Sequence, residues 1–344
     1  HSVPLDHSLL APRSLSIVLV GIVPAKKNCQ QVQSSTVHCT ASTTVPILHF
    51  TMQPDGPIKD ESSNNNNEEE DGSKSIDMNL VLTATQDFYR RHSDIIKESH
   101  GWSHAKRVYE HSCRAVQVVS SAPSITATTA LLIQIAALLH DVDDSKYFPN
   151  EDNNEYYKNA QSILRQAKVP RSHWKSILFM IDQVSCSKNG NRLPQCIVND
   201  DDDSCSYDHY YYYWLIPRWA DRIEAVGARG VWRCYQYNRE HGMPLCLDGT
   251  SPRPRTVEEV YRYATRERFE AYQTTGGRST DMISHYYDKL LHVACPPKEI
   301  VRNSYLEEQL QNSAKELIEV CLRYGKTGVV DEEYIQSLAN TEHN

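Results

Sequence analysis

The segment from Ala127 to Leu139 constrains the fold of this chain most strongly, because nearly all of its residues are apolar. A helix that is apolar on every face must be surrounded by other parts of the protein. The segment ends in the dipeptide His140-Asp141. Burying both side chains unpaired costs several kcal/mol, and a divalent cation would offset that cost, because imidazole and carboxylate both ligate such ions. Taken alone, the dipeptide is more often a capped helix end.

Apolar residues recur at helical spacing over most of the chain after residue 78, whereas alternating strand patterns are scarce. The sequence therefore predicts an all-α domain. Ser103 is expected to cap the second helix. The expected helices cover residues 79–99, 104–119, 127–139, 154–167, 173–184, 215–227, 257–274, 283–293 and 305–324.

Residues outside this helical region differ in composition. Residues 1–78 are rich in Ser, Thr, Gln, Asn and acidic residues, which predicts a disordered extension. Within them, the short apolar run 15–23 could belong to a targeting peptide. The domain is expected over 79–330, followed by a tail at 331–344. Residues 200–214, with four aspartates and a run of tyrosines, are interpreted as a solvated inserted loop rather than a cation site.

Charge and cysteine usage exclude several function classes. The formal net charge of −8 argues against broad binding to nucleic-acid polymers or anionic membranes. No apolar run reaches the roughly 18 residues that a membrane span requires. The ten cysteines form no CxxC pair, which favours reduced, packed thiols in a reducing compartment such as the cytoplasm.

Two other positions supply potential ligands of the same types. His104 stands at the start of the helix expected over 104–119, and Asp221 lies midway along the helix expected over 215–227. Carboxylates and one amine also follow the His-Asp pair directly, within residues 141–147.

This order resembles the HD-domain superfamily of metal-dependent phosphohydrolases, with a histidine on one helix, His-Asp ending a second and an aspartate on a later one. The closer resemblance is to a branch of predicted HD hydrolases that includes bacterial nucleotide pyrophosphohydrolases. It extends over roughly residues 87–293 and is carried by segments 138–147, 184–188, 220–227 and 284–291. Two features depart from the pattern. His100-Gly101 stands where the family usually has His-Asp, and the insertion lengthens the approach to Asp221.

The resemblance implies an HD-domain helical bundle that holds one divalent metal ion, Mn²⁺ or Mg²⁺. The implied ligands are His104, His140, Asp141 and Asp221. Such an ion would activate water for attack on phosphorus in a small phosphorylated substrate, for example a nucleotide.

Other polar residues are candidates for catalysis and substrate binding. Asp144 and Glu224 could orient the water or act as general base, although a buried ion pair with an arginine is the alternative for Glu224. His100 is assigned a supporting role behind the ligands, and His285 a core or substrate-contacting role. The candidate phosphate-binding residues, each of which could equally form a surface ion pair, are Lys146, Lys188, Arg222 and Lys289.

Two other function classes remain open at this point. A metal-stabilised scaffold or nucleotide sensor would bind at the same site without turnover, and the intact set of four ligands disfavours it. A di-iron oxygenase of the HD superfamily would need further ligands for a second metal, and no His-His-Asp cluster after His140 supplies them. The oligomeric state is left open.

We expect residues 1–78 to be dispensable for folding and metal binding, because such a segment buries too little apolar area to offset its ordering entropy. A chain that begins near Asn79 should keep the helical circular-dichroism signal and the metal affinity of the full chain. An insoluble shortened protein beside a soluble full chain would contradict this division.

Overall fold

The computed structural model describes residues 75–119, 125–149, 156–194 and 212–339. All of them lie in one compact unit, Glu68–Asn344. These ranges contain helices and no β-strand, which confirms the all-α class. Residues 1–74 of the predicted N-terminal extension, which include the run 15–23, and residues 200–211 of the predicted insertion lie outside the described residues. No helix in the described ranges is long and apolar enough to cross a membrane, and the six cysteines within them are free thiols.

Short helical turns separate longer helices along the chain. In chain order the described elements are α1 (Met78–Arg91), η1 (Glu98–His100), α2 (Trp102–Val119), α3 (Ala127–Leu139), α4 (Lys158–Gln166), η2 (Arg171–His173), α5 (Trp174–Asp182), α6 (Cys186–Asn189), α9 (Ile216–Ile223), α10 (Gly227–Glu240), α11 (Val257–Tyr263), α12 (Arg266–Thr274), α13 (Met282–His285), η3 (Tyr286–Leu290), α14 (Leu291–Ala294), α15 (Lys298–Val301), α16 (Ser304–Leu310), α17 (Lys315–Thr327) and α18 (Glu332–Ala339).

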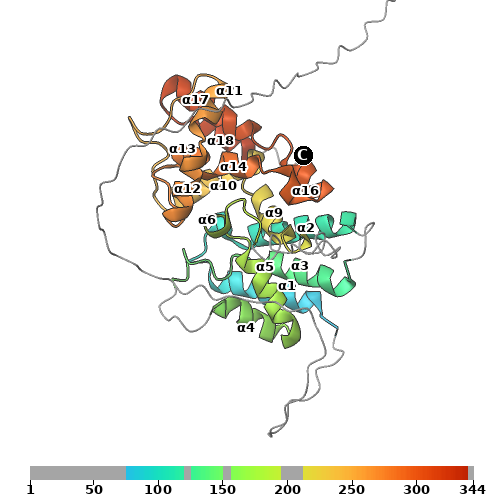
Figure 1. Ribbon diagram of the computed structural model, residues 1–344. Coiled ribbons are helices and arrows are strands. Elements are labelled where there is room, and N and C mark those ends of the chain that lie inside the picture. Colours follow the sequence, from blue (N-terminus) through green and yellow to red (C-terminus); the bar gives the residue numbers. More distant parts are fainter. Residues whose placement is uncertain (1–74, 120–124, 150–155, 195–211, 340–344) are drawn as a thin grey trace, which may run out of the picture. The chain divides into compact units, whose positions relative to one another are not determined.

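Helix α3 lies at the centre of one group of helices. It contacts α1, α2, α5 and α9 (Figure 1). Thr126 caps its first turn by accepting from the Thr129 amide, and its last five residues, Ile135 to Leu139, have no exposed surface. The apolar sequence of α3 therefore has the expected consequence: neighbours cover it, and its end at His140 is delivered into the interior.

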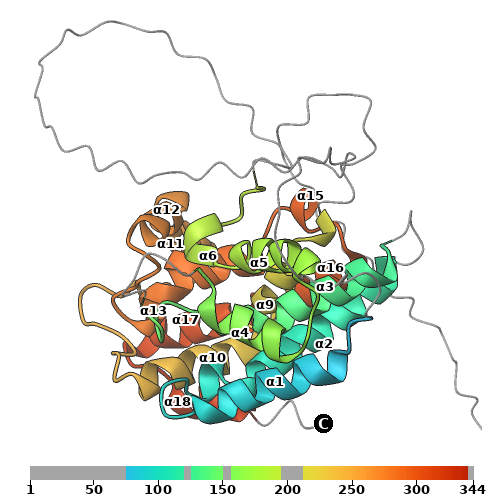
Figure 2. The same ribbon diagram turned by 90° about the horizontal axis from the view of Figure 1, so that it is seen from below.

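A second group forms around α10, which contacts α17, α18 and η1 (Figure 2). The two groups meet where α9 turns into α10. Gly227 has a φ of +65° at this turn, a conformation that favours glycine. Gly230, one turn further on, lies directly against the backbone of Ala225 with no space for a Cβ. The direction of α10 relative to α9, and so the placement of η1, depends on this turn at Gly227 and on the close approach at Gly230.

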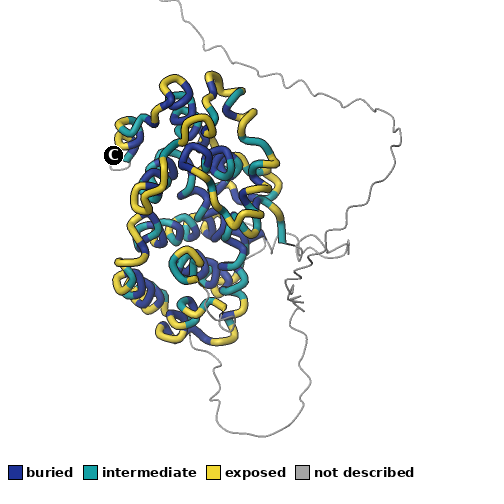
Figure 3. The backbone as a smooth tube through the Cα atoms, turned by 90° about the vertical axis from the view of Figure 1, so that its left-hand side faces the viewer, coloured by how far each residue is buried: buried dark blue, intermediate teal, exposed yellow. Residues whose placement is uncertain are grey.

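Burial alternates along the helices as their amphipathic sequences predict. Figure 3 shows the buried residues on the inner sides of the helices and the exposed residues on the outer sides. One connected core includes residues of nearly all described helices.

Several local expectations differ from the structure. Ser103 is the second residue of α2 rather than its cap, because the helix already begins at Trp102. The patterns over 257–274 and 305–324 are each split into two helices: Thr265 caps the start of α12, and Asn312 adopts a positive φ between α16 and α17.

Three further elements differ from those expected from the sequence. Helix α10 was not predicted, the segment 283–293 contains a π-helical turn at η3, and the predicted tail includes α18, which packs on α10. At the other end, the side chain of Asp77 caps α1 by accepting from the Asn79 amide. A shortened chain that begins at Ser75 keeps this cap, which is worth about 1 kcal/mol.

We expect Gly230→Ala to lower the free energy of unfolding by about 1–3 kcal/mol, because its Cβ would overlap the backbone of Ala225 rather than a movable side chain. Chemical denaturation measures this change. Gln236→Ala, on the same helix, is the control and should stay within about 0.5 kcal/mol of the wild type. Equal stability of the two variants would contradict the close approach.

Candidate metal centre

Three helices bring two histidines and two aspartates to one point. His104 comes from the first turn of α2, His140 and Asp141 follow the end of α3, and Asp221 lies on α9. The two Nε2 atoms are 3.1 Å apart. Oδ2 of Asp141 lies 3.5 Å from Nε2 of His104 and 3.2 Å from Nε2 of His140. Oδ1 of Asp221 lies 3.3 and 3.6 Å from the same two nitrogens.

The hydrogen bonds of the two imidazoles show which nitrogens can act as ligands. His140 Nδ1 lies 2.8 Å from the carbonyl oxygen of Ala137, so it carries a proton and donates to it. His104 Nδ1 is buried without a hydrogen bond and faces Oε2 of Glu224 at 3.8 Å. In each neutral ring the proton then belongs on Nδ1 and the lone pair on Nε2. Two lone pairs facing each other beside two carboxylates form a donor set that fits a divalent cation.

In the metal-free protein, the pKa values of the cluster show that its imidazoles and carboxylates stabilise each other's charges. Burial lowers the pKa of His140, but Asp141 and Asp221 outweigh it and raise that pKa to about 10. The pKa of His104 is also raised: burial and Arg233 oppose the shift, and the nearby carboxylates of Asp141, Asp221 and Glu224 outweigh them. Burial disfavours ionisation of both aspartates, yet the two imidazoles hold their pKa values well below the usual range. Without a cation, protons on the imidazoles balance the carboxylates.

Glu224 lies on the far side of His104 from the cluster. Its carboxylate is almost fully buried and lies 2.8 Å from Arg107 Nε, 3.4 Å from His111 Nε2 and 3.5 Å from Arg229 Nε. Burial raises the pKa of Glu224, but the nearby imidazoles of His104 and His111 outweigh it and hold the pKa well below its usual range. Glu224 therefore sits in the buried ion-pair network that was the alternative interpretation, in a place suited to orienting His104.

Asp144 and Lys146 form a pair at the open side of the cluster. Lys146 Nζ lies 3.0 Å from Oδ2 of Asp144, and the backbone amide of Lys146 donates to Oδ1 at 3.0 Å. The side chain of Lys146 is 47% exposed, so its ammonium can still reach a ligand from solvent.

Lys289 lies close enough to Asp221 and Lys146 for their charges to interact, and His285 lies close enough to both lysines. Burial lowers the pKa of Lys289, while Tyr272, Cys186 and Asp221 outweigh it and raise that pKa. The pKa of His285 is lowered well below its usual value by burial and then by Lys289 and Lys146. The structure thus gathers two lysines around the approach to the aspartates.

Arg222 and Lys188 are placed differently. Arg222 is 1% exposed and donates to the carbonyl of Gly190 and to Asn191 Oδ1. Its guanidinium holds residues 190–191, directly after α6, and does not face solvent. Lys188 is 64% exposed and lies 3.5 Å from Asp182 on the surface.

Several residues that support the centre were not predicted from the sequence. Arg218, one turn before Arg222, donates to the carbonyls of Gln183 and Arg192, so two arginines on one face of α9 hold the segments on both sides of α6. Their spacing of four residues in an apolar helix was a visible signal. The other missed residues, which belong to the network around Glu224 and to the attachment of η1, are Arg107, His111, Arg229, Arg233 and Glu240.

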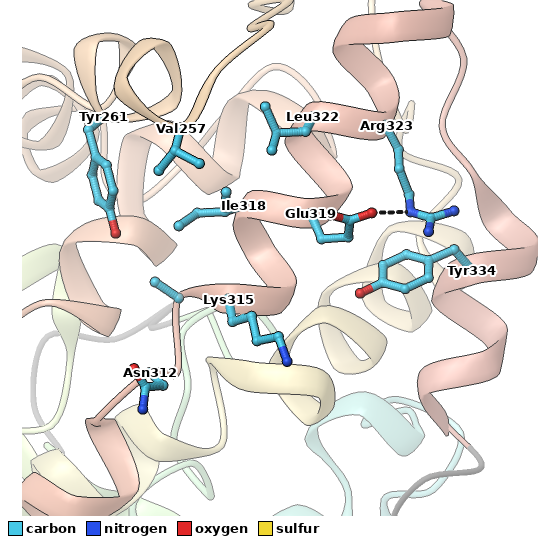
Figure 4. Close-up of a pocket in the computed structure, with 10 residues that line it drawn as sticks. Val257, Tyr261, Asn312, Lys315, Ile318, Glu319, Leu322, Arg323 and Tyr334 are labelled. Atoms are coloured by element: carbon cyan, nitrogen blue, oxygen red, sulfur yellow. Dashed lines mark hydrogen bonds and ion pairs between the residues drawn. The ribbon is translucent and has the colours of Figure 1, made fainter. Parts of the chain in front are cut away.

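A groove of about 590 Å³ lies apart from these residues, between α11, α17 and α18 (Figure 4). Its lining includes Tyr261, Ile318 and Leu322, and Glu319 pairs with Arg323 at 2.7 Å along one side. None of the predicted site residues lines it.

Comparison with known proteins shows one relative over most of the chain. The chain is 32% identical over 259 residues to the uncharacterized protein L803 of Acanthamoeba polyphaga mimivirus, covering 72% of this chain and 95% of the viral protein. The chain belongs to the same protein family as L803. No protein-family model matches the chain.

Several solved bacterial structures are also similar. They include a protein of Lactobacillus plantarum (21% identity, 73% of this chain and 98% of that chain, TM-score 0.47), the Lin1889 protein of Listeria innocua (19%, 77% and 97%, 0.37) and an HD-superfamily hydrolase of Bacillus thuringiensis (19%, 75% and 97%, 0.36). In this structure a histidine, a His-Asp pair and an aspartate from three helices meet at one point, as the resemblance to HD-domain proteins implies. His104, His140 and Asp141 form a cluster that could hold a metal ion.

We expect metal binding at pH 7 to release about one proton or more per ion, because His140, with a pKa of about 10, must lose its proton to become a ligand. The affinity should therefore rise by up to about tenfold per pH unit between pH 7 and 9. Titration calorimetry in two buffers of different ionisation enthalpy counts the protons. An apparent enthalpy that is identical in both buffers would contradict the prediction that His140 is protonated before the metal binds.

Proposed function

We propose that this protein is a metal-dependent phosphohydrolase that cleaves a phosphoester or phosphoanhydride bond in a small substrate. One observation carries this proposal. The Nε2 atoms of His104 and His140 face the carboxylates of Asp141 and Asp221 within 3.2–3.6 Å. That donor set leaves further positions of a divalent ion open for water and substrate.

The four side chains of the cluster would hold the ion. Mn²⁺ and Mg²⁺ are the proposed ions, from the resemblance to HD phosphohydrolases. A bound divalent ion lowers the pKa of a ligated water and polarises a phosphoryl oxygen.

Residues around the cluster would position the reactants. Asp144 stands three residues after Asp141 at the open side, where its carboxylate can orient the attacking water and accept its proton. Lys146 and Lys289 can neutralise phosphate oxygens, which is the main requirement of phosphoryl transfer. Glu224 would keep His104 Nδ1 protonated and its Nε2 free, a role that carboxylates commonly have behind ligand histidines.

We further propose that the substrates include nucleotides. Support comes from the segments around Asp141, Asp221 and Lys289, which resemble nucleotide pyrophosphohydrolases. A screen of the purified protein with Mn²⁺ or Mg²⁺ against nucleotides and generic phosphoesters tests both proposals, the phosphohydrolase activity and the use of nucleotides as substrates. Pyrophosphate released from a nucleoside triphosphate indicates attack at the α-phosphorus, whereas orthophosphate indicates a terminal phosphatase.

We expect hydrolysis to stop when the protein is dialysed against a chelator and to return when Mn²⁺ or Mg²⁺ is added. Released phosphate is measured together with the metal content. Full activity in a sample that elemental analysis shows to be metal-free would contradict the mechanism.

We expect Asp221→Ala and Lys146→Ala to fail in different ways. Asp221→Ala removes a carboxylate from the cluster and should weaken metal binding by at least about 100-fold. Lys146→Ala should keep the wild-type metal content and lower kcat/KM by about 10- to 100-fold, the value of a charge-assisted hydrogen bond. Metal analysis and steady-state kinetics separate the two. Wild-type metal occupancy and turnover in Asp221→Ala, or loss of metal in Lys146→Ala, would contradict these assignments.

A further inference from the structure

The short helix η1, which precedes α2, is attached to the distant end of α10. Ser99 Oγ lies 2.5 Å from Oε2 of Glu240, and the Ser99 amide donates to Oε1 at 3.4 Å. Arg233 Nε donates to the Ser99 carbonyl at 2.8 Å, and its Nη1 donates to the carbonyl of Glu224. Ser99 itself has no exposed surface. The contacts of Ser99 with Glu240 and Arg233 join residues 141 and 134 positions apart in the chain and fix the backbone that carries His100.

The hydrogen bonds of Ser99 determine where His100 carries its proton. The carboxylate of Glu240 can only accept, so the single hydroxyl proton of Ser99 is donated to it. Ser99 Oγ must then accept from its second neighbour, His100 Nδ1, at 3.1 Å. His100 Nε2 faces the Lys146 ammonium, which can only donate, so this nitrogen accepts and the ring is neutral. A neutral ring with its proton on Nδ1 has a lone pair on Nε2.

That lone pair faces the lysine at the open side of the metal centre. His100 Nε2 lies 3.5 Å from Lys146 Nζ, which also contacts Asp144 and lies 5.6 Å from the ring centre of Tyr237. The opposite tautomer of His100 would place an N–H against the ammonium. An acceptor at this position therefore restricts a long side chain that would otherwise sample many rotamers.

We propose that His100 is a positioning residue for Lys146, and that Glu240 acts through Ser99 to fix the imidazole tautomer that this requires. The proposal rests on the proposed phosphohydrolase function, because His100 would orient the Lys146 ammonium toward the phosphate of the substrate. It gives a role to His100 at the position where the chain departs from the HD-family pattern, followed by Gly101 instead of an aspartate.

The tautomer is tested first, on the metal-free protein labelled with ¹⁵N-histidine. In the wild type, the imidazole signals assigned to His100 should show a protonated Nδ1 and an unprotonated Nε2. Ser99→Ala removes the acceptor and should shift the population toward the Nε2-protonated form, whereas Ser93→Ala on the exposed surface should leave the signals unchanged. A wild-type His100 protonated on Nε2 would overturn the proposal.

The effect on the lysine is tested next, with inorganic pyrophosphate titrated into the Mg²⁺-loaded protein. We expect His100→Ala to weaken pyrophosphate binding by about 3- to 10-fold at unchanged Mg²⁺ affinity, and Lys146→Ala by about 10-fold or more. The double variant should bind no more than about twofold weaker than Lys146→Ala, because His100 acts through the lysine. His100→Gln, which retains an acceptor near Nε2, should recover part of the affinity. Glu98→Ala, on the same short helix, is the matched control and should bind like the wild type.

The outcomes separate this proposal from the proposed function. Pyrophosphate binding that survives His100→Ala, or losses that multiply in the double variant, would overturn the positioning role alone. A wild-type protein that binds no pyrophosphate with Mg²⁺ would contradict both, since no phosphate subsite would exist at Lys146.

Discussion

The meeting of two imidazoles and two carboxylates at the end of a buried helix is the constraint on which the rest of this structure depends. Two buried imidazoles beside two half-buried carboxylates are costly unless each group is paired. Here the two Nε2 atoms face Asp141 and Asp221, so protons or a divalent ion can balance the carboxylates. Helices α2, α3 and α9 must therefore pack in one register, because a shift of any of them would leave a buried charge unpaired.

A layer of buried charge behind the cluster maintains that register. Glu224 sits behind His104 with arginine partners from α2 and α10, and so connects both helices to α9. On the same helix, Arg218 and Arg222 bind backbone carbonyls on both sides of α6. Helix α9 thus presents Asp221 to the cluster and its arginines to structural partners. The proposed chemistry uses polar groups outside this layer, namely Asp144, Lys146 and Lys289.

The sequence was most informative about the central helix and about the residues of the family pattern. The apolar run predicted α3 with its observed bounds, and the family pattern predicted that His104, His140, Asp141 and Asp221 would come together. It was least informative where the role depends on which way a side chain points. Asp221 and Arg222 are neighbours, but adjacent helical residues point about 100° apart, so one faces the cluster and the other a loop. The contact between Ser99 and Glu240 links elements too distant in sequence for any local pattern to indicate.

A crystal structure of the protein grown with Mn²⁺, with anomalous data collected at the manganese edge, tests the central claim most directly. We expect one anomalous peak among α2, α3 and α9, with Nε2 of both histidines and one oxygen each from Asp141 and Asp221 at about 2.0–2.3 Å. Asp144 and Lys146 would remain outside the coordination sphere. No peak at this position at saturating Mn²⁺, or an ion that leaves both Nε2 atoms uncoordinated, would contradict a metal centre built on these four side chains.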